Sequence, residues 1–474
     1  MVSNLEAELN SIVLNHTDER LTLKLNRLLI LVSIVFTLTL VGSLAYGINE
    51  KFLFFILVGF LCLLVSLSST LVYFLFVATI FLPHNHFLHV SVFFTPFIAL
   101  SFLINTYSYH RADFKTPLNK AILIYTLSVL PSIYNSSDKL ASLGKLYNLV
   151  ALLIVMFSIL ISIRDDKKVA ALIYLFLAGV FFNTIYTIYL ALSTGNRAYG
   201  FSGIFYVDFV GLGALFLVII FIYSKGVKKI FSGFLVIFFI TGLILTQTRN
   251  AWLSFAVSFI LLMLYLLKNH RNYFLSRKLL ASFILLMIVV GYVVYFSASS
   301  ISTTLDDRIS GKTQITELTE STASIGENSF ITRALIWHTA ANAFITHPFV
   351  GIGVYSFPFS SQYYYTIPKS FYKVYVEGRT PHVTFIAVLA ETGVIGFIGF
   401  VFLLIVIIKT AFQNLRQLKS VKNIPFSLII NWTFVYMLIS MFMTDAWLWG
   451  QQLMIIAIFL GLLVAQNKKS IVIN

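Results

Sequence analysis

Residues 229–267 read KIFSGFLVIFFITGLILTQTRNAWLSFAVSFILLMLYLL, which is two apolar runs joined by a short polar turn. A helix needs about 20 predominantly apolar residues to cross a bilayer, and each of these runs approaches that length. Similar runs recur along the chain from Arg27 to Val464. The pattern predicts an all-α polytopic membrane protein.

The composition agrees with this prediction. Of the 474 residues, 59% are hydrophobic and 11% are charged, whereas a soluble domain is roughly 45–50% apolar and about 25% charged. The net charge of +15 comes from short basic clusters between apolar runs, so it indicates membrane topology and no nucleic-acid partner. The single cysteine, Cys62, can build neither a disulfide framework nor a cysteine-based metal site.

The apolar runs predict about fourteen spans, several of them short. They lie near 27–46, 51–66, 67–82, 90–106, 119–134, 144–163, 169–192, 203–223, 229–246, 250–267, 279–297, 382–408, 425–444 and 447–465. An N-terminus in the cytoplasm places the basic clusters in cytoplasmic loops, as the positive-inside rule requires. Both chain termini are therefore predicted to be cytoplasmic.

One long polar segment, 298–381, separates the N-terminal spans within 1–297 from the C-terminal spans within 382–474. The orientation above places it outside the membrane as one large periplasmic loop, where function is expected to concentrate. Asn328 or Ser329 can cap a helix within it that runs to about Thr346, because the following His347-Pro348 ends it.

Few charged residues are expected at the outer ends of spans: Arg197, Asp208, Arg249, Arg308, Arg333, Arg379, His382 and Asp445. Positive-inside statistics disfavour arginine there, so the presence of Arg249 in the turn TQTRNAW needs an explanation. Binding of a phosphate group is one explanation, because the guanidinium fork matches phosphate oxygens. Contact with lipid headgroups is the alternative for Arg249 and the favoured interpretation for Arg197, Arg308 and Arg379.

His382 follows Pro381 at the start of the predicted span PHVTFIAVLAETGVIGF. The positive end of that helix would disfavour the imidazolium form, so a neutral ring could accept a proton as a general base. A structural or headgroup contact is the alternative for this residue taken alone. Glu391, well inside the same span, would face the opposite side and pack against a neighbouring helix.

No cofactor is predicted. The sequence has no Gly-rich phosphate loop with a following lysine and no acidic pair near the outer face. Nucleotide hydrolysis and metal-dependent transfer are therefore not expected.

Four segments, in this order, resemble the O-antigen ligase and polymerase superfamily of bacterial envelope glycosyltransferases. They are TQTRNAW, ITRALIWHTA, HPFVGIGVYSF and PHVTFIAVLAETGVIGF. The resemblance implies a GT-C-like fold of about 12, up to 14, transmembrane helices in the bacterial inner membrane. It also implies inverting, metal-independent transfer without a nucleotide sugar. The His-Asn pair of many relatives is His382-Val383 in this chain.

The TQTR turn looks closer to the ligases, which transfer an O-antigen glycan from undecaprenyl diphosphate to a sugar hydroxyl of lipid A-core. This step of lipopolysaccharide biosynthesis takes place at the periplasmic face. By motif position, Arg249 and Arg333 would hold the donor diphosphate, and His382 would be the catalytic base. Arg197, Trp337 and Arg379 are accessory candidates.

Three other functions stay open. A polymerase uses the same donor but extends another lipid-linked repeat unit, and a protein O-oligosaccharyltransferase uses a serine or threonine hydroxyl. A transporter of lipid-linked glycans, from a different class, predicts ionisable groups near the bilayer midplane, broken helices and two related halves. The candidate charged residues are expected instead at the outer ends of spans, which favours transfer chemistry over transport.

Overall fold

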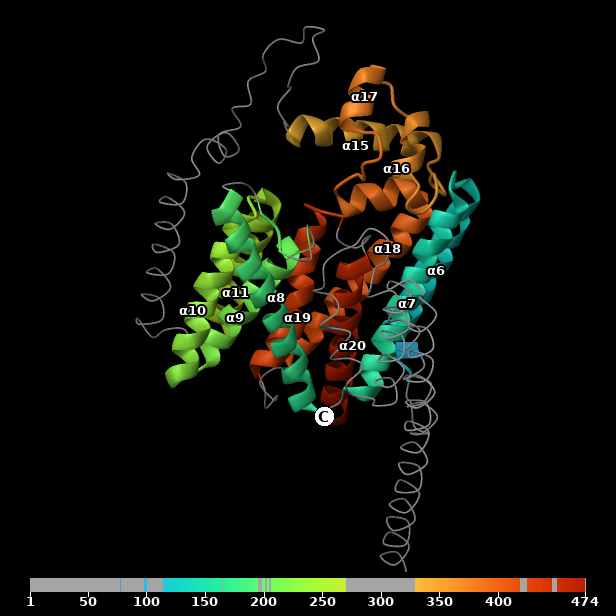
Figure 1. Cartoon of the computed structure of the whole chain (residues 1–474). Coiled ribbons are helices and arrows are strands. Elements are labelled where there is room, and N and C mark those ends of the chain that lie inside the picture. The colour runs from blue at the N-terminus through green and yellow to red at the C-terminus, as the bar shows by residue number, and fades with distance from the viewer. Residues whose placement is uncertain are drawn as a thin grey trace, which may run out of the picture. The chain divides into compact units, whose positions relative to one another are not determined.

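The structure is a computed structural model that describes residues 77, 98–99, 114–163, 165–194, 198–200, 203, 206–269, 329–417, 424–445 and 450–473. All of them except Ile98 and Ala99 belong to one compact unit, which comprises 76–95 and 112–474. Every regular element in these ranges is a helix (Figure 1). The predicted all-α class is therefore confirmed for the described part of the chain.

Among the described residues, six helices are long and apolar enough to cross a membrane. They are α7 (Lys139–Ser162), α8 (Asp166–Thr194), α9 (Tyr206–Tyr223), α10 (Gly226–Leu245), α11 (Arg249–Asn269) and α18 (Thr384–Arg416). The helices α19 (Ile424–Met441) and α20 (Gly450–Ile473) have shorter apolar stretches. Each of the eight coincides with a predicted span. The predicted spans between 27 and 106, apart from a few positions, and the one near 279–297 lie outside the described residues, so the total of 12 to 14 stays a prediction.

The predicted span 119–134 is divided in the structure. The helix α6 (Asn119–Val129) has 11 residues and is followed by the 3-10 helix η1 (Leu130–Asn135). Pro131 lies at the start of η1, where its missing N–H costs no hydrogen bond. Eleven residues are too few for a helix that crosses a bilayer alone.

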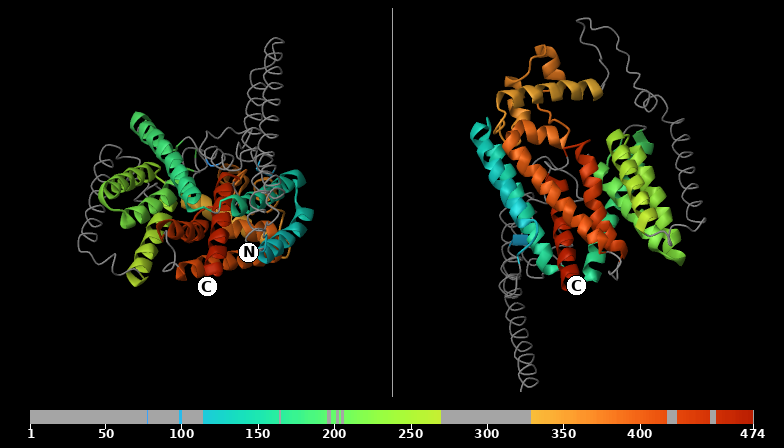
Figure 2. Two further views of the ribbon diagram at one scale, coloured as in Figure 1. Left: turned by 90° about the horizontal axis from the view of Figure 1, so that it is seen from below. Right: turned by 180° about the vertical axis from the view of Figure 1, so that it is seen from behind.

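The helix α9 is the most deeply packed of the candidate spans, with 78% of its apolar window buried. It packs against α10, α8, α11 and α19, while α7 runs along α20 and α18 along α6 (Figure 2). Aromatic rings connect these groups of helices. The ring centroid of Phe216 on α9 lies 5.4 Å from that of Phe176 on α8 and 5.5 Å from that of Phe459 on α20. Aromatic pairs at such separations stabilise a core beyond their buried area.

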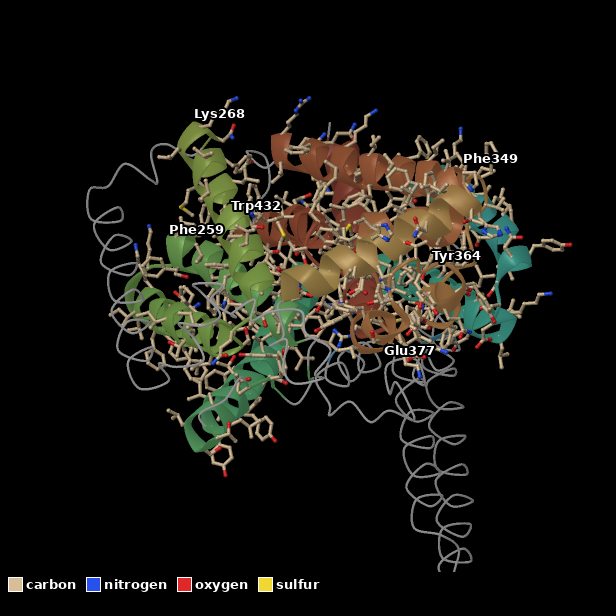
Figure 3. The ribbon with its side chains drawn as sticks, turned by 90° about the horizontal axis from the view of Figure 1, so that it is seen from above. Phe259, Lys268, Phe349, Tyr364, Glu377 and Trp432 are labelled. Atoms are coloured by element: carbon tan, nitrogen blue, oxygen red, sulfur yellow. The ribbon has the colours of Figure 1, made fainter. Side chains whose placement is uncertain are left out.

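The segment 329–381 has a small core of its own. It contains α15 (Ser329–Thr346), α16 (Phe357–Ser360), the 3-10 helix η3 (Ser361–Tyr363) and α17 (Lys369–Tyr375). The predicted loop helix agrees with α15. Tyr372 and Tyr375 are buried against Ile336 and Phe357, and Tyr364 packs edge-on against His347. Figure 3 labels Tyr364 in this segment. Several tyrosines therefore hold the segment together.

The helix α18 is interrupted at Gly393, which has φ 63° and ψ −168°. The N–H groups of Val394 and Ile395, which follow the break, donate to the carbonyl oxygens of Pro348 at 2.8 Å and Phe349 at 3.1 Å. The first turn of the second half-helix is thus bonded to the loop that follows α15.

The same loop also provides hydrogen bonds to carbonyl groups at the end of the first half-helix. The N–H groups of Ile352 and Gly353 donate to the carbonyl oxygens of Ala390 at 3.2 Å and Glu391 at 2.9 Å. Unpaired backbone groups at helix ends are costly when they are buried. Segment 348–353 therefore stabilises the break and fixes the loop against α18.

We expect Gly393→Ala to destabilise the protein. The left-handed φ alone costs a side chain of the order of 1–3 kcal/mol, and an added Cβ would lie 2.4 Å from the carbonyl carbon of Phe349. The measurement is the thermal unfolding midpoint of the purified variant in detergent. Gly144→Ala is the matched control, because Gly144 is helical with nothing within 4 Å of an added Cβ. Equal midpoints for the two variants would contradict the geometry at the break.

Candidate functional site

His382 lies just before α18, in an unusual backbone conformation. Its φ is 58°, in the left-handed region that residues other than glycine rarely adopt. The helix begins at Thr384, with Val383 at the N-cap, so His382 lies two residues before the helix that forms the predicted span. Such strained conformations persist where the surrounding structure holds them, and they often mark functional sites.

Two contacts hold the chain around His382. The indole Nε1 of Trp337, on α15, donates to the carbonyl oxygen of Pro381 at 3.0 Å. On the other side, the N–H and the hydroxyl of Thr384 both donate to the carbonyl oxygen of Thr444, at 3.1 Å and 2.8 Å. Trp337, an accessory candidate from the sequence, thus fixes the peptide that precedes His382.

Arg333 lies one turn before Trp337 on α15. Its guanidinium donates to Oδ1 of Asn250 at 3.2 Å, and Nδ2 of Asn250 donates to the carbonyl oxygen of Met443 at 2.9 Å. Three separate segments therefore meet at Asn250. Arg249 is the neighbouring residue and the first of α11, but its side chain lies outside the described part of the structure, as does Arg197.

Asp445 follows α19 and comes from the same segment as Met443 and Thr444. Its side chain is buried, and no hydrogen bond reaches its Oδ2 from the described residues. The carboxylate acts electrostatically on His382. The sequence indicates a carboxylate at the end of a span here, but the role beside His382 depends on the fold.

Burial lowers the pKa of His382 below its usual value, and the positive charges of Arg333 and Arg379 lower it further. The carboxylate of Asp445 opposes this shift by raising the pKa. The lowered pKa supports the prediction that the His382 ring is neutral. Its main cause, however, is burial and not the positive end of a helix. A neutral imidazole at neutral pH can accept a proton.

We expect Asp445→Asn to move the acid limb of the pH–rate profile to lower pH. The negative charge of Asp445 raises the pKa of His382, so its removal lowers that pKa, and the ring stays neutral at lower pH. The measurement is the apparent pKa of kcat/KM for the variant and the wild type. Glu377→Gln, at an exposed carboxylate of the segment 329–381, should leave the limb in place. An unchanged limb in Asp445→Asn would show that Asp445 does not act on His382.

Arg308 lies outside the described residues, and the other predicted residues have structural contacts. The guanidinium of Arg379 is exposed and donates to the carbonyl oxygen of Val374 at 3.1 Å. The sequence predicts that Glu391 packs against a neighbouring helix, and its carboxylate accepts the N–H groups of Tyr355 at 2.8 Å and of Phe357, the first residue of α16, at 3.3 Å. Glu391 therefore fixes the chain that follows segment 348–353.

Asp208, on α9, has partners from two other helices. The hydroxyl of Ser440 donates to its Oδ1 at 3.0 Å, and the amide of Gln452 donates to its Oδ2. In the described part of the chain, no group of three or more His, Cys, Asp or Glu side chains could hold a metal ion. The expectation of metal-independent chemistry stays a prediction.

The apolar helices and the family match together define an all-helical integral membrane protein, with a polar cluster where α11, α15, α18 and the segment after α19 meet. Residues 234–401 match the family model described as O-antigen ligase. This match supports the resemblance, drawn from the four motifs, to the O-antigen ligase and polymerase superfamily. The family indicates a glycosyltransferase-like enzyme of the O-antigen pathway. No curated protein matches the sequence.

Proposed function

We propose that this protein is an O-antigen ligase of the bacterial inner membrane. It transfers the O-antigen glycan from undecaprenyl diphosphate to a sugar hydroxyl of lipid A-core at the periplasmic face, with inversion and without a metal ion. The observation that supports the proposal is the contact of Arg333 with Asn250, together with the charges of Arg333 and Asp445 that act on His382. All of these residues except Asp445 lie in the segment that matches the family.

In the proposed reaction, the acceptor hydroxyl oxygen attacks the anomeric carbon of the donor sugar. The bond between that carbon and the diphosphate oxygen breaks, and the diphosphate leaves with the electron pair. His382 accepts the hydroxyl proton, for which a neutral ring is needed. Attack opposite the leaving group inverts the anomeric centre.

Negative charge builds on the leaving diphosphate, and arginines stabilise it. Arg333 is half-buried, and it is held by Asn250, so its guanidinium is oriented before the donor arrives. Fixed donors of this kind are worth more in a site that excludes water. Arg249, next to Asn250, is proposed as the second arginine at the diphosphate.

The proposal places 298–381 in the periplasm and both chain termini in the cytoplasm. The spans within 1–297 and 382–474 then form a GT-C-like frame around the site. Both substrates are anchored in the same membrane, which restricts their approach to one face.

A broken helix such as α18 would also suit a transporter, in which the free backbone groups at a break bind substrates or ions. In this protein the groups around Gly393 are bonded to residues 348–353, so they are not available to a substrate. This observation supports transfer over transport. A polymerase and a protein O-oligosaccharyltransferase share the donor chemistry and are separated only by the acceptor.

The test uses two bacterial strains, one without its O-antigen ligase and one without its O-antigen polymerase, each expressing the wild-type protein. We expect the lipopolysaccharide ladder to return in the first strain and not in the second. Restoration in the polymerase-deficient strain alone would identify a polymerase. Modified serine or threonine residues on proteins, with no ladder in either strain, would identify a protein glycosylating enzyme.

A further inference from the structure

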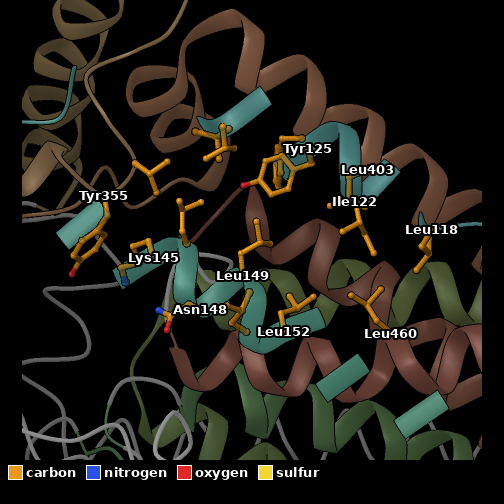
Figure 4. A pocket seen from close by; sticks show the side chains of 16 residues that line it. Leu118, Ile122, Tyr125, Lys145, Asn148, Leu149, Leu152, Tyr355, Leu403 and Leu460 are labelled. Carbon is orange, nitrogen blue, oxygen red and sulfur yellow. The ribbon is translucent and has the colours of Figure 1, made fainter. Parts of the chain in front are cut away.

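An apolar cavity of about 80 Å³ lies between α6, α7, α18 and α20 (Figure 4). Leu149 and Leu152 line it from α7, Leu403 from α18 and Leu460 from α20. Pockets that enclose a whole drug-sized ligand measure roughly 300–1,000 Å³. A cavity this much smaller suits a segment of one hydrocarbon chain.

One end of the cavity holds a lysine, Lys145, on which the carboxylates of Glu391 and Asp445 act electrostatically. The ammonium of Lys145 lies 3.7 Å from the centroid of the Tyr355 ring, which is within the range of a cation–π interaction. Tyr355 is fixed in turn, because its N–H donates to Glu391. Glu391, next to the break in α18, therefore also orients the polar end of the cavity.

The polar end is coupled electrostatically to the candidate site, because Asp445 acts on Lys145, together with Glu391, and also on His382. Leu152 lies seven residues after Lys145 on α7, which is about 10 Å along the helix. The cavity thus leads from a cation on which Asp445 acts to apolar side chains further along the bundle.

We propose that this cavity receives the first part of the donor's polyprenyl chain and that Lys145 binds the phosphate next to that chain. This inference rests on the proposed function, because the donor is a single-chain lipid with a diphosphate, whereas lipid A carries several acyl chains. Lys145 complements a phosphate in charge, and Arg333 is left to contact the phosphate next to the sugar.

The test measures binding of undecaprenyl phosphate to the purified full chain in detergent, by native mass spectrometry and without turnover. Leu149→Trp fills the cavity, and Lys145→Met removes the charge while it keeps an apolar stem. We expect each variant to bind about tenfold more weakly, the factor that a lost interaction of 1.4 kcal/mol produces. Val150→Trp is the matched control, because Val150 is 49% exposed on the same helix, and its binding should equal that of the wild type.

Phosphatidylglycerol, a two-chain anionic lipid, is the second probe. Equal affinity for it, with the same losses in both variants, would identify a general lipid site and overturn the proposal. Unchanged binding of undecaprenyl phosphate in folded Leu149→Trp and Lys145→Met would also overturn the proposal. In that case, a lipopolysaccharide ladder restored by the wild type would leave the ligase assignment intact. Conversely, retained polyprenyl binding with no ladder would remove the ligase assignment alone.

Discussion

Transfer by the His382→Asn variant is expected to be about 10²- to 10⁴-fold slower than wild-type transfer, with the fold retained. Asparagine adopts left-handed backbone conformations more readily than most residues, so it should keep the geometry that φ 58° requires. It has no nitrogen basic enough to accept the acceptor's proton. The substitution therefore separates the proposed base from the backbone strain at the same position.

The measurement is the initial rate of glycan transfer from purified lipid-linked donor to a core acceptor, in detergent and over a range of pH. The matched control is His338→Asn, at an exposed histidine on α15, and it should transfer at the wild-type rate. In the wild type, the acid limb should lie below the usual pKa of histidine, because burial and two arginines lower the pKa of His382. A folded His382→Asn protein that transfers at more than a tenth of the wild-type rate would show that His382 is not the base.

The helices of this protein could be predicted from the sequence because apolar runs of span length have one stable solution in lipid. The pairing of Arg333 with Trp337 could also be predicted, since residues four apart lie on one face of a helix. Both residues do reach the same site from α15, through Asn250 and Pro381. Local periodicity was sufficient for these features.

The break in α18 could not be predicted in this way. Within ETGVIGF, Gly393 resembles any glycine of a membrane helix, and nothing local shows that the residue is left-handed. The break is stable only because residues 348–353, which come much earlier in the chain, supply the missing hydrogen bonds. The backbone of His382 is set by similar long-range contacts, from Trp337 and Thr444.

The role of Asp445 could not be predicted for a different reason. Its place in the sequence shows a carboxylate at the end of a span, but the groups that it acts on come from other segments. Its effect on His382 and Lys145 needs the segment after α19 to meet the start of α18. For Arg249 and Arg333, in contrast, the residue type alone suggests a phosphate site. The structure adds the contact of Arg333 with Asn250, which brings α15 to the first turn of α11.

Arg333→Gln is expected to lower the transfer rate by about 10²- to 10³-fold, the usual cost of one preorganised donor at a developing charge. Arg333→Lys should recover only part of this loss, because an ammonium keeps the charge but not the planar fork. The measurement is the plateau rate at a pH well above the pKa of His382, with saturating acceptor and varied donor.

The control for charge is Arg379→Gln. Both arginines lower the pKa of His382, so either substitution should raise it and move the acid limb to higher pH. Only Arg333 contacts the first turn of α11 in the described part of the chain, so the plateau should fall much more for Arg333→Gln. An unchanged plateau in Arg333→Gln, with the acid limb moved to higher pH, would mean that Arg333 acts through the pKa of His382 alone and does not bind the donor diphosphate.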